Sequence, residues 1–152
     1  MITAVAAIAL GVWDSAQNRR HNRLSVAPYL VCDYSMTATP KATTFIVILS
    51  NEGIGPAIIR SVQIQLPEAL GGGSFDEWGP VVAALRARGV DVQNYWNFEA
   101  DEALGVQKQQ ELLRAIVAQS NATERMMQDL GSIRVAVKYA SVYGDVREAR
   151  LN

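Results

Sequence analysis

Acidic side chains come closest to a catalytic pattern in this sequence. Asp76 and Glu77 are adjacent, and a second group contains Glu99, Asp101 and Glu102. Two carboxyl groups that face one another across a cleft can hydrolyse a glycosidic bond, one as an acid and the other as a base or nucleophile. Both groups lie in stretches expected to be loops, where carboxylates are usually solvated. A weak hydrolase with paired carboxylates is therefore only our second alternative for the function.

Other catalytic chemistries lack the residues that they need. The chain has one histidine, His21, and one cysteine, Cys32. A Ser-His-Asp triad needs a histidine at a shaped site, and a structural zinc site needs more nitrogen and sulfur ligands. The glycines at 71–73 are not followed by the Lys-Ser or Lys-Thr pair of a phosphate-binding loop. We therefore expect no catalytic residue, no cofactor and no metal, and we interpret the chain as non-enzymatic.

The composition fits a single folded domain with no preference for polyanions. Of 152 residues, 49% are hydrophobic and 19% are charged, which argues against disorder. Lysine and arginine number 14 against 15 acidic residues, a net charge of -1. Nucleic acid is therefore not an expected partner.

The N-terminal segment has the composition of a membrane anchor. Residues 1–13 carry no charged side chain, and an arginine cluster follows at Arg19, Arg20 and Arg23. Trp13 suits the aromatic belt of a bilayer interface, and the arginines suit its anionic headgroups. We expect these four side chains to contact membrane lipids.

The apolar segment is short for a complete membrane span. Thirteen helical residues extend about 20 Å, against a bilayer core of about 30 Å. Three explanations stay open: the apolar segment continues upstream of residue 1, it inserts into a locally thinned bilayer, or it is a helix that packs on protein. A cleaved signal peptide is less favoured. For an anchor, the positive-inside rule places residues 24–152 on the cytoplasmic face of the membrane, with single-pass or peripheral attachment. We therefore divide the chain into an anchor with its basic flank, 1–23, and a domain, 24–152.

Period-two alternation predicts several strands in the domain. Residues 24–36 alternate, with Pro28 indicating an edge strand and Cys32 a buried thiol. The β-branched run 43–49 predicts a central strand covered on both faces, forming a hairpin with the strand 57–66. Further strands are expected at 95–98 and 133–139. A closing strand is expected after the turn at residues 144–145, running toward residue 151. The segment 103–117 is ambiguous, and we favour a strand in its second half.

Two short helices interrupt these strands. Gly79 and Pro80 are expected to be the cap and first residue of a helix that continues to residue 88. Asn121 to Glu124 resembles a capping box that opens a helix ending at Gly131. The expected fold is mainly β: an antiparallel, immunoglobulin-like sandwich of six to seven strands, with one or two short helices and an N-terminal apolar helix.

Three segments carry a resemblance to a known group. They are residues 21–30, the pattern from Asn51 through Gly53 and Gly55 to Ile59, and residues 139–144. Over these residues the chain resembles small bacterial membrane-anchored proteins of unknown function. The resemblance implies one N-terminal transmembrane helix followed by a compact β-rich domain at the bacterial inner membrane. It implies no catalytic residue.

Two segments are candidates for interaction. Asn51, Gly53 and Gly55 form a turn that is explained by its geometry, although exposed amides in such a turn can also hold an anion. Tyr95 and Trp96 begin an aromatic cluster that is either a recognition patch or, as we favour, core. The first hypothesis for the function is a non-enzymatic, membrane-anchored module that binds another protein. The alternative is a domain that binds a small ligand or anion through the turn.

Overall fold

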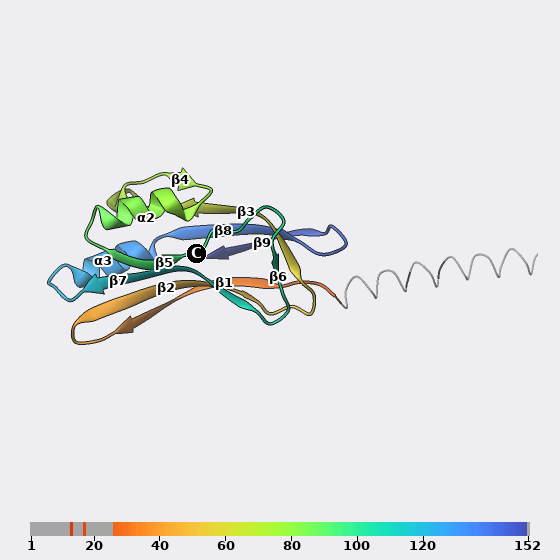
Figure 1. Cartoon of the computed structure of the whole chain (residues 1–152), viewed down its shortest axis with the longest axis horizontal. Coiled ribbons are helices and arrows are strands. Elements are labelled where there is room, and N and C mark those ends of the chain that lie inside the picture. The colour runs from red at the N-terminus through yellow and green to blue at the C-terminus, as the bar shows by residue number, and fades with distance from the viewer. Residues whose placement is uncertain (1–12, 14–16, 18–25, 152) are drawn as a thin grey trace, which may run out of the picture.

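A computed structural model describes Trp13, Gln17 and residues 26–151. Within residues 26–151 the chain forms nine strands, two of them only two residues long, two α-helices and one short 3-10 helix (Figure 1). In chain order they are β1 (Leu30–Ala38), β2 (Ala42–Asn51), β3 (Ala57–Gln65), η1 (Glu68–Leu70), β4 (Ser74–Phe75), α2 (Trp78–Arg86), β5 (Asp91–Tyr95), β6 (Ala103–Leu104), β7 (Gln109–Ala118), α3 (Thr123–Gly131), β8 (Arg134–Ala140) and β9 (Val146–Leu151).

The strands form two antiparallel sheets. One sheet has the order β1-β2-β7-β5, and the other has the order β4-β3-β8-β9 with β6 also paired to β3. Buried side chains of both sheets belong to one hydrophobic cluster, to which α2 contributes Val81, Val82 and Leu85. The prediction of a mainly β, antiparallel fold with two short helices is confirmed.

Strand β2 shows how the sequence builds this core. Its buried residues alternate with half-buried ones, and Phe45, Val47 and Leu49 are fully buried. The strand is central, between β1 and β7, as expected. The prediction that both of its faces are covered is wrong, because only alternate side chains point into the shared core.

A β-bulge in β7 explains the ambiguity of residues 103–117. Val47 pairs with Leu113 and the next residue of β2, Ile48, pairs with Glu111, so Leu112 is an extra residue. Both leucines are buried. Adjacent buried residues break the alternation and imitate helical spacing, although the second half of the segment is a strand as we favoured.

The predicted hairpin between residues 43–49 and 57–66 is wrong. Strand β2 pairs with β1 and β7, whereas β3 pairs with β4, β6 and β8 in the other sheet. The turn 51–57 therefore carries the chain from one sheet to the other. A turn sequence alone does not distinguish these two connections.

Several predicted boundaries also change. Strand β1 begins at Leu30 and not at residue 24, although it is an edge strand. Helix α2 is capped by Glu77 and not by Gly79. Helix α3 has no capping box: its N-cap is Ala122, and the Thr123 hydroxyl donates to the Ala118 carbonyl at 2.9 Å.

The predicted membrane-contacting arginines, Arg19, Arg20 and Arg23, lie outside the described residues, as does nearly all of the expected apolar helix. Trp13 is described; it is helical and 65% exposed. Within the part of the chain that the structure describes, no helix is both long and apolar enough to span a membrane.

Candidate functional site

A groove lies between β3, the beginning of α2 and the segment that follows β5. Its volume is about 470 Å³. Its lining combines aromatic, apolar and charged residues: Ile59, Arg60, Ser61, Val62, Asp76, Glu77, Trp78, Trp96, Asn97, Phe98, Glu99 and Ala100. We call this site the Trp96 groove.

Hydrogen bonds fix the walls of the Trp96 groove to the two sheets. The Trp78 amide at the start of α2 donates to Asn97 Oδ1 at 2.8 Å. The Ile59 amide of β3 donates to the Glu102 carbonyl at 2.8 Å, and the Trp96 amide donates to the Leu112 carbonyl at 3.1 Å. The groove is therefore built from anchored backbone on three sides.

An ion pair joins β3 to the loop beside the groove. Ile59 pairs with Tyr139 and Ser61 pairs with Lys138, so Arg60 is the extra residue of a β-bulge. The Arg60 guanidinium contacts the carboxylate of Asp101, a residue with a positive φ of 61°. Both side chains are substantially exposed, so the pair contributes little to stability.

The groove is aromatic and mainly acidic. Trp96 is 41% exposed, whereas Trp78 is 1% exposed and its indole Nε1 has no hydrogen-bond partner among the described residues. Three carboxylates line the groove against one guanidinium, that of Arg60. This combination suits a ligand that carries positive charge or an aromatic or aliphatic side chain.

The two aromatic candidates from the sequence are surface residues. Tyr95 ends β5 and is 40% exposed, and Trp96 lies in the groove. Our interpretation of this cluster as core is therefore wrong for both, although Phe98 is partly buried against the core. Trp78 was not among the predicted site residues, because the Gly79-Pro80 pair indicates a helix that begins after Trp78, whereas α2 begins at Trp78 itself.

The buried side chain of Asn51 links three segments of the chain by hydrogen bonds, and we call this set of bonds the Asn51 clamp. Its Nδ2 donates to the carbonyl oxygens of Gly55 at 2.9 Å, Leu104 at 3.0 Å and Gly105 at 3.2 Å. Its Oδ1 accepts from the amides of Gly53 at 3.0 Å and Tyr29 at 3.3 Å. One side chain thus joins the segment before β1, the turn 51–57 and the end of β6.

Gly53 and Gly55 are required by close backbone packing. A Cβ on Gly53 would overlap the backbone of residues 27–29, and a Cβ on Gly55 would overlap the carbonyl of Val26. The turn's amides are also engaged: Glu52 donates to the Tyr29 carbonyl and Ile54 to the Ala27 carbonyl. The geometry of the turn therefore explains Asn51 and both glycines as structural residues.

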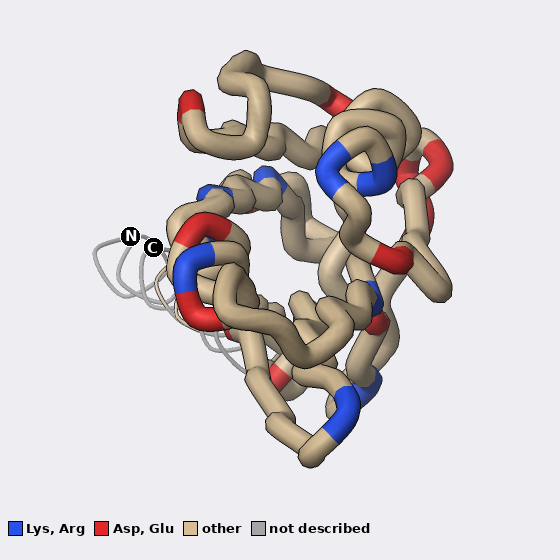
Figure 2. Tube along the Cα trace, turned by 90° about the vertical axis from the view of Figure 1, so that its left-hand side faces the viewer, with Lys and Arg blue, Asp and Glu red and all other residues tan. Residues whose placement is uncertain are grey.

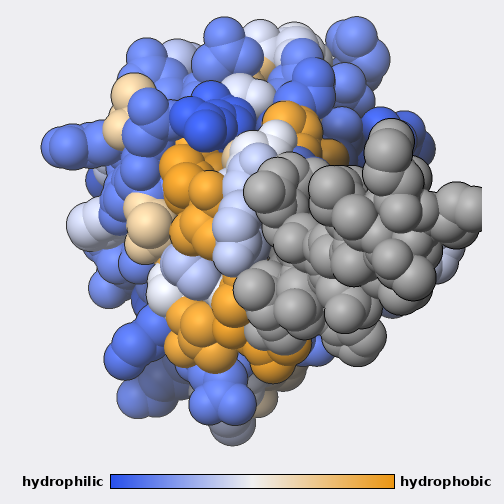
Figure 3. Space-filling model, turned by 90° about the vertical axis from the view of Figure 1, so that its right-hand side faces the viewer, coloured by the Kyte–Doolittle hydropathy of each residue, from blue (hydrophilic) through white to orange (hydrophobic). Residues whose placement is uncertain are grey.

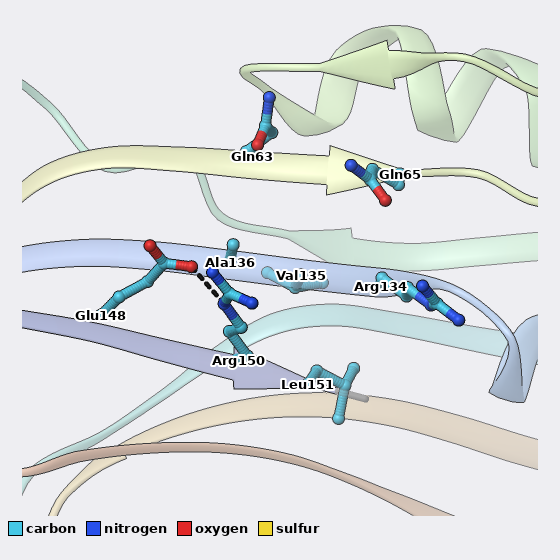
Figure 4. Close-up of a pocket in the computed structure, with 8 residues that line it drawn as sticks. All are labelled: Gln63, Gln65, Arg134, Val135, Ala136, Glu148, Arg150 and Leu151. Carbon is cyan, nitrogen blue, oxygen red and sulfur yellow. Dashed lines mark hydrogen bonds and ion pairs between the residues drawn. The ribbon is translucent and has the colours of Figure 1, made fainter.

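A second, smaller hollow lies on the outer face of β3, β8 and β9 (Figure 4). Its volume is about 200 Å³, and its lining includes Gln63, Gln65, Arg134 and Arg150. Arg150 donates a hydrogen bond to Glu148, which lowers the pKa of that carboxyl. No aromatic side chain lines this hollow, which is typical of a solvated sheet face.

Charge is mixed over the domain as a whole. Figure 2 shows basic positions interspersed with acidic ones along the trace. Within the described part, no group of three or more His, Cys, Asp or Glu residues could hold a metal ion. Because acidic and basic residues are mixed over the domain, a preference for charged ligands can arise only at a local site such as the Trp96 groove.

Cys32 is a buried thiol in β1, as predicted. Burial, and secondly the nearby Asp33 carboxylate, raise the pKa of the Cys32 thiol to about 12. Because the thiolate is the nucleophilic form, this side chain is unreactive near neutral pH.

No protein-family model matches this chain, and no curated protein is significantly similar to it.

Proposed function

We propose that this chain is a non-enzymatic, membrane-anchored module that binds another protein through the Trp96 groove. The observation that carries the proposal is the exposed Trp96 side chain in a groove whose walls are fixed by backbone hydrogen bonds. Exposed tryptophans in defined hollows are frequent energetic centres of protein interfaces. The apolar segment 1–13 and its arginines would hold the domain at the bacterial inner membrane, on the cytoplasmic face.

The partner segment would be cationic. Lysine or arginine side chains bind to the face of an indole, and carboxylates accept their hydrogen bonds. Asp76, Glu77 and Glu99 supply those carboxylates at the groove. An apolar side chain beside the cation would pack against Trp96.

The alternative of an anion site in the turn 51–57 has less support. The amides of Glu52, Gly53 and Ile54 already donate to acceptors of the protein itself. A weak hydrolase is also less favoured: Asp76, Glu77 and Glu99 line the groove, but of the other candidate acids Asp101 is engaged by Arg60 and Glu102 accepts from the Glu99 amide.

The finer fold prediction, an immunoglobulin-like sandwich, is a proposal that rests on the single core shared by two antiparallel sheets. The resemblance to small bacterial membrane-anchored proteins is likewise a proposal.

Photo-crosslinking in membranes tests the proposed function. A photoreactive amino acid replaces Ala100, which lines the groove and carries no charge, and the control replaces the exposed Ala38 at the end of β1. We expect a discrete adduct with a second protein from position 100 and none from position 38. Absence of an adduct from position 100, or the same adducts from both positions, would contradict the proposal.

A further inference from the structure

Four segments of the domain meet at one end, which we call the Val26 end. Leu30 pairs with Asn51, Ser50 with Gln109, and Ile58 with Ala140, so these strand ends lie together. The Val26 end therefore comprises residues 26–29, the turn 51–57, and the loops 105–108 and 141–146. The described domain begins at this end (Figure 1).

Exposed apolar side chains gather at the Val26 end. Six of the domain's exposed large hydrophobic residues are there, and Ile54 and Val146 are more than 60% exposed. The six are Tyr29, Ile54, Val106, Val142, Tyr143 and Val146. Figure 3 shows apolar side chains side by side on this face of the molecule. Such clustering, unlike single exposed apolar residues, marks a surface that binds something apolar.

Ordered loops hold these side chains outward. The Ile54 amide donates to the Ala27 carbonyl at 3.2 Å. In the loop 141–146, the Ser141 hydroxyl oxygen accepts from the amides of Tyr143 and Asp145, both at 3.2 Å. The apolar tips are therefore presented by hydrogen-bonded turns.

The sequence before Val26 indicates what covers this surface. Residues 1–13 are apolar, and only residues 14–25 separate them from the domain. Twelve residues extend at most about 40 Å, so an anchored segment would keep the Val26 end within reach of the bilayer. Arg19, Arg20 and Arg23 lie in this connection, where anionic headgroups would attract them.

We propose that the Val26 end docks on the lipid surface, with Ile54, Val142 and Val146 entering the interfacial region. The inference rests on the membrane-anchoring part of the proposed function. The exposed charges at the Val26 end are balanced. Glu52 and Asp145 are acidic, whereas Lys108 and Arg147, the latter at the start of β9, are basic. Contact would therefore depend on apolar burial, and the charge of the lipid would act mainly through the arginines.

Site-specific labelling of the full chain tests this proposal. Cys32 is buried, and in a Cys32→Ala background Val142→Cys or Ile54→Cys carries a polarity-sensitive fluorophore. Gln63→Cys, on the outer face of β3, is the control. With vesicles of phosphatidylcholine and phosphatidylglycerol, we expect blue-shifted emission, several-fold weaker quenching by iodide and strong quenching by spin-labelled lipid at positions 142 and 54 only.

The outcomes separate anchoring from docking. Flotation of the chain with vesicles reports the anchor. Flotation with unchanged iodide quenching at positions 142 and 54 would overturn docking and leave the anchor intact, whereas no flotation would remove both. Protection of position 142 in detergent alone, together with the mass of a dimer, would overturn the lipid proposal in favour of a second copy of the chain.

Discussion

The side-chain amide of Asn51 donates a hydrogen bond of 3.0 Å to the carbonyl oxygen of Leu104, a residue 53 positions further along the chain. Together with its bonds to Gly55 and Tyr29, this contact joins the end of β2 to the loops at the Val26 end. The clamp holds the loops that present the exposed apolar side chains. It also connects to the other sheet, because β6 pairs with β3.

Replacing Asn51 with Ala should destabilise the domain strongly. The change leaves several buried backbone groups without partners, and we expect a loss of about 2–4 kcal/mol in the free energy of unfolding. Urea unfolding measures the loss. Ser50→Ala is the matched control, because Ser50 makes only a 3.4 Å bond to the Val31 carbonyl. Equal effects of the two substitutions would contradict the clamp.

Gly55→Ala should abolish or severely weaken folding. Its Cβ would overlap the Val26 carbonyl, a backbone atom that cannot move aside without shifting the segment before β1. Gly79→Ala in α2 is the control, because a Cβ there meets nothing within 4 Å and alanine favours a helix by about 0.5–1 kcal/mol. Thermal unfolding compares the variants. A Gly55→Ala protein as stable as the wild type would show that this close packing is wrong.

The Cys32 thiol should make stability fall at high pH. Its pKa is about 12 in the folded chain against an ordinary value of 9.0. Above pH 9 the unfolded chain loses the thiol proton that the folded chain keeps, so the free energy of unfolding should fall by up to about 1.4 kcal/mol per pH unit. Urea unfolding between pH 8 and pH 11 compares the wild type with Cys32→Ala. Identical pH dependence of the unfolding free energy in the wild type and in Cys32→Ala would contradict a raised pKa for the Cys32 thiol.

Arg60→Gln should strengthen binding of a cationic partner at the Trp96 groove. The substitution removes the guanidinium that lines the groove and frees the Asp101 carboxylate. Because the pair is exposed, stability should change by less than about 1 kcal/mol. The yield of the Ala100 photo-adduct should rise, and added salt should reduce the gain. A lower yield at unchanged stability would contradict an acidic recognition site.

The parts of the fold that could be predicted are those that depend on local pattern. Alternation in residues 133–139 fixes the buried face of β8, and the β-branched run identifies β2. The pairing of β3 could not be predicted, because a glycine-rich turn serves equally for a hairpin and for a crossing between sheets. The bulge at Leu112 made β7 hard to recognise in the sequence, because one extra residue interrupts the two-residue alternation of buried side chains.

The candidate site was predictable only in part. Trp96 stood out as an aromatic residue, but its exposure depends on α2 and β3, whose positions relative to it are tertiary. Asn51, Gly53 and Gly55 were expected in a turn, but the reason for both glycines is close packing on residues 26–29, a tertiary contact that the sequence does not show. Arg60 and Asp101 are 41 residues apart, and their contact, at a bulge in β3, depends on tertiary structure.

The most direct test of the proposed function compares two exposed aromatic residues in the crosslinking experiment. With the photoreactive amino acid at position 100, Trp96→Ala should reduce the adduct at least tenfold, the effect expected for a residue at an energetic centre that contributes about 1.4 kcal/mol or more. Tyr34→Ala, an exposed aromatic in β1 outside the groove, should leave the adduct unchanged. An undiminished adduct from a folded Trp96→Ala protein would contradict partner binding at the Trp96 groove.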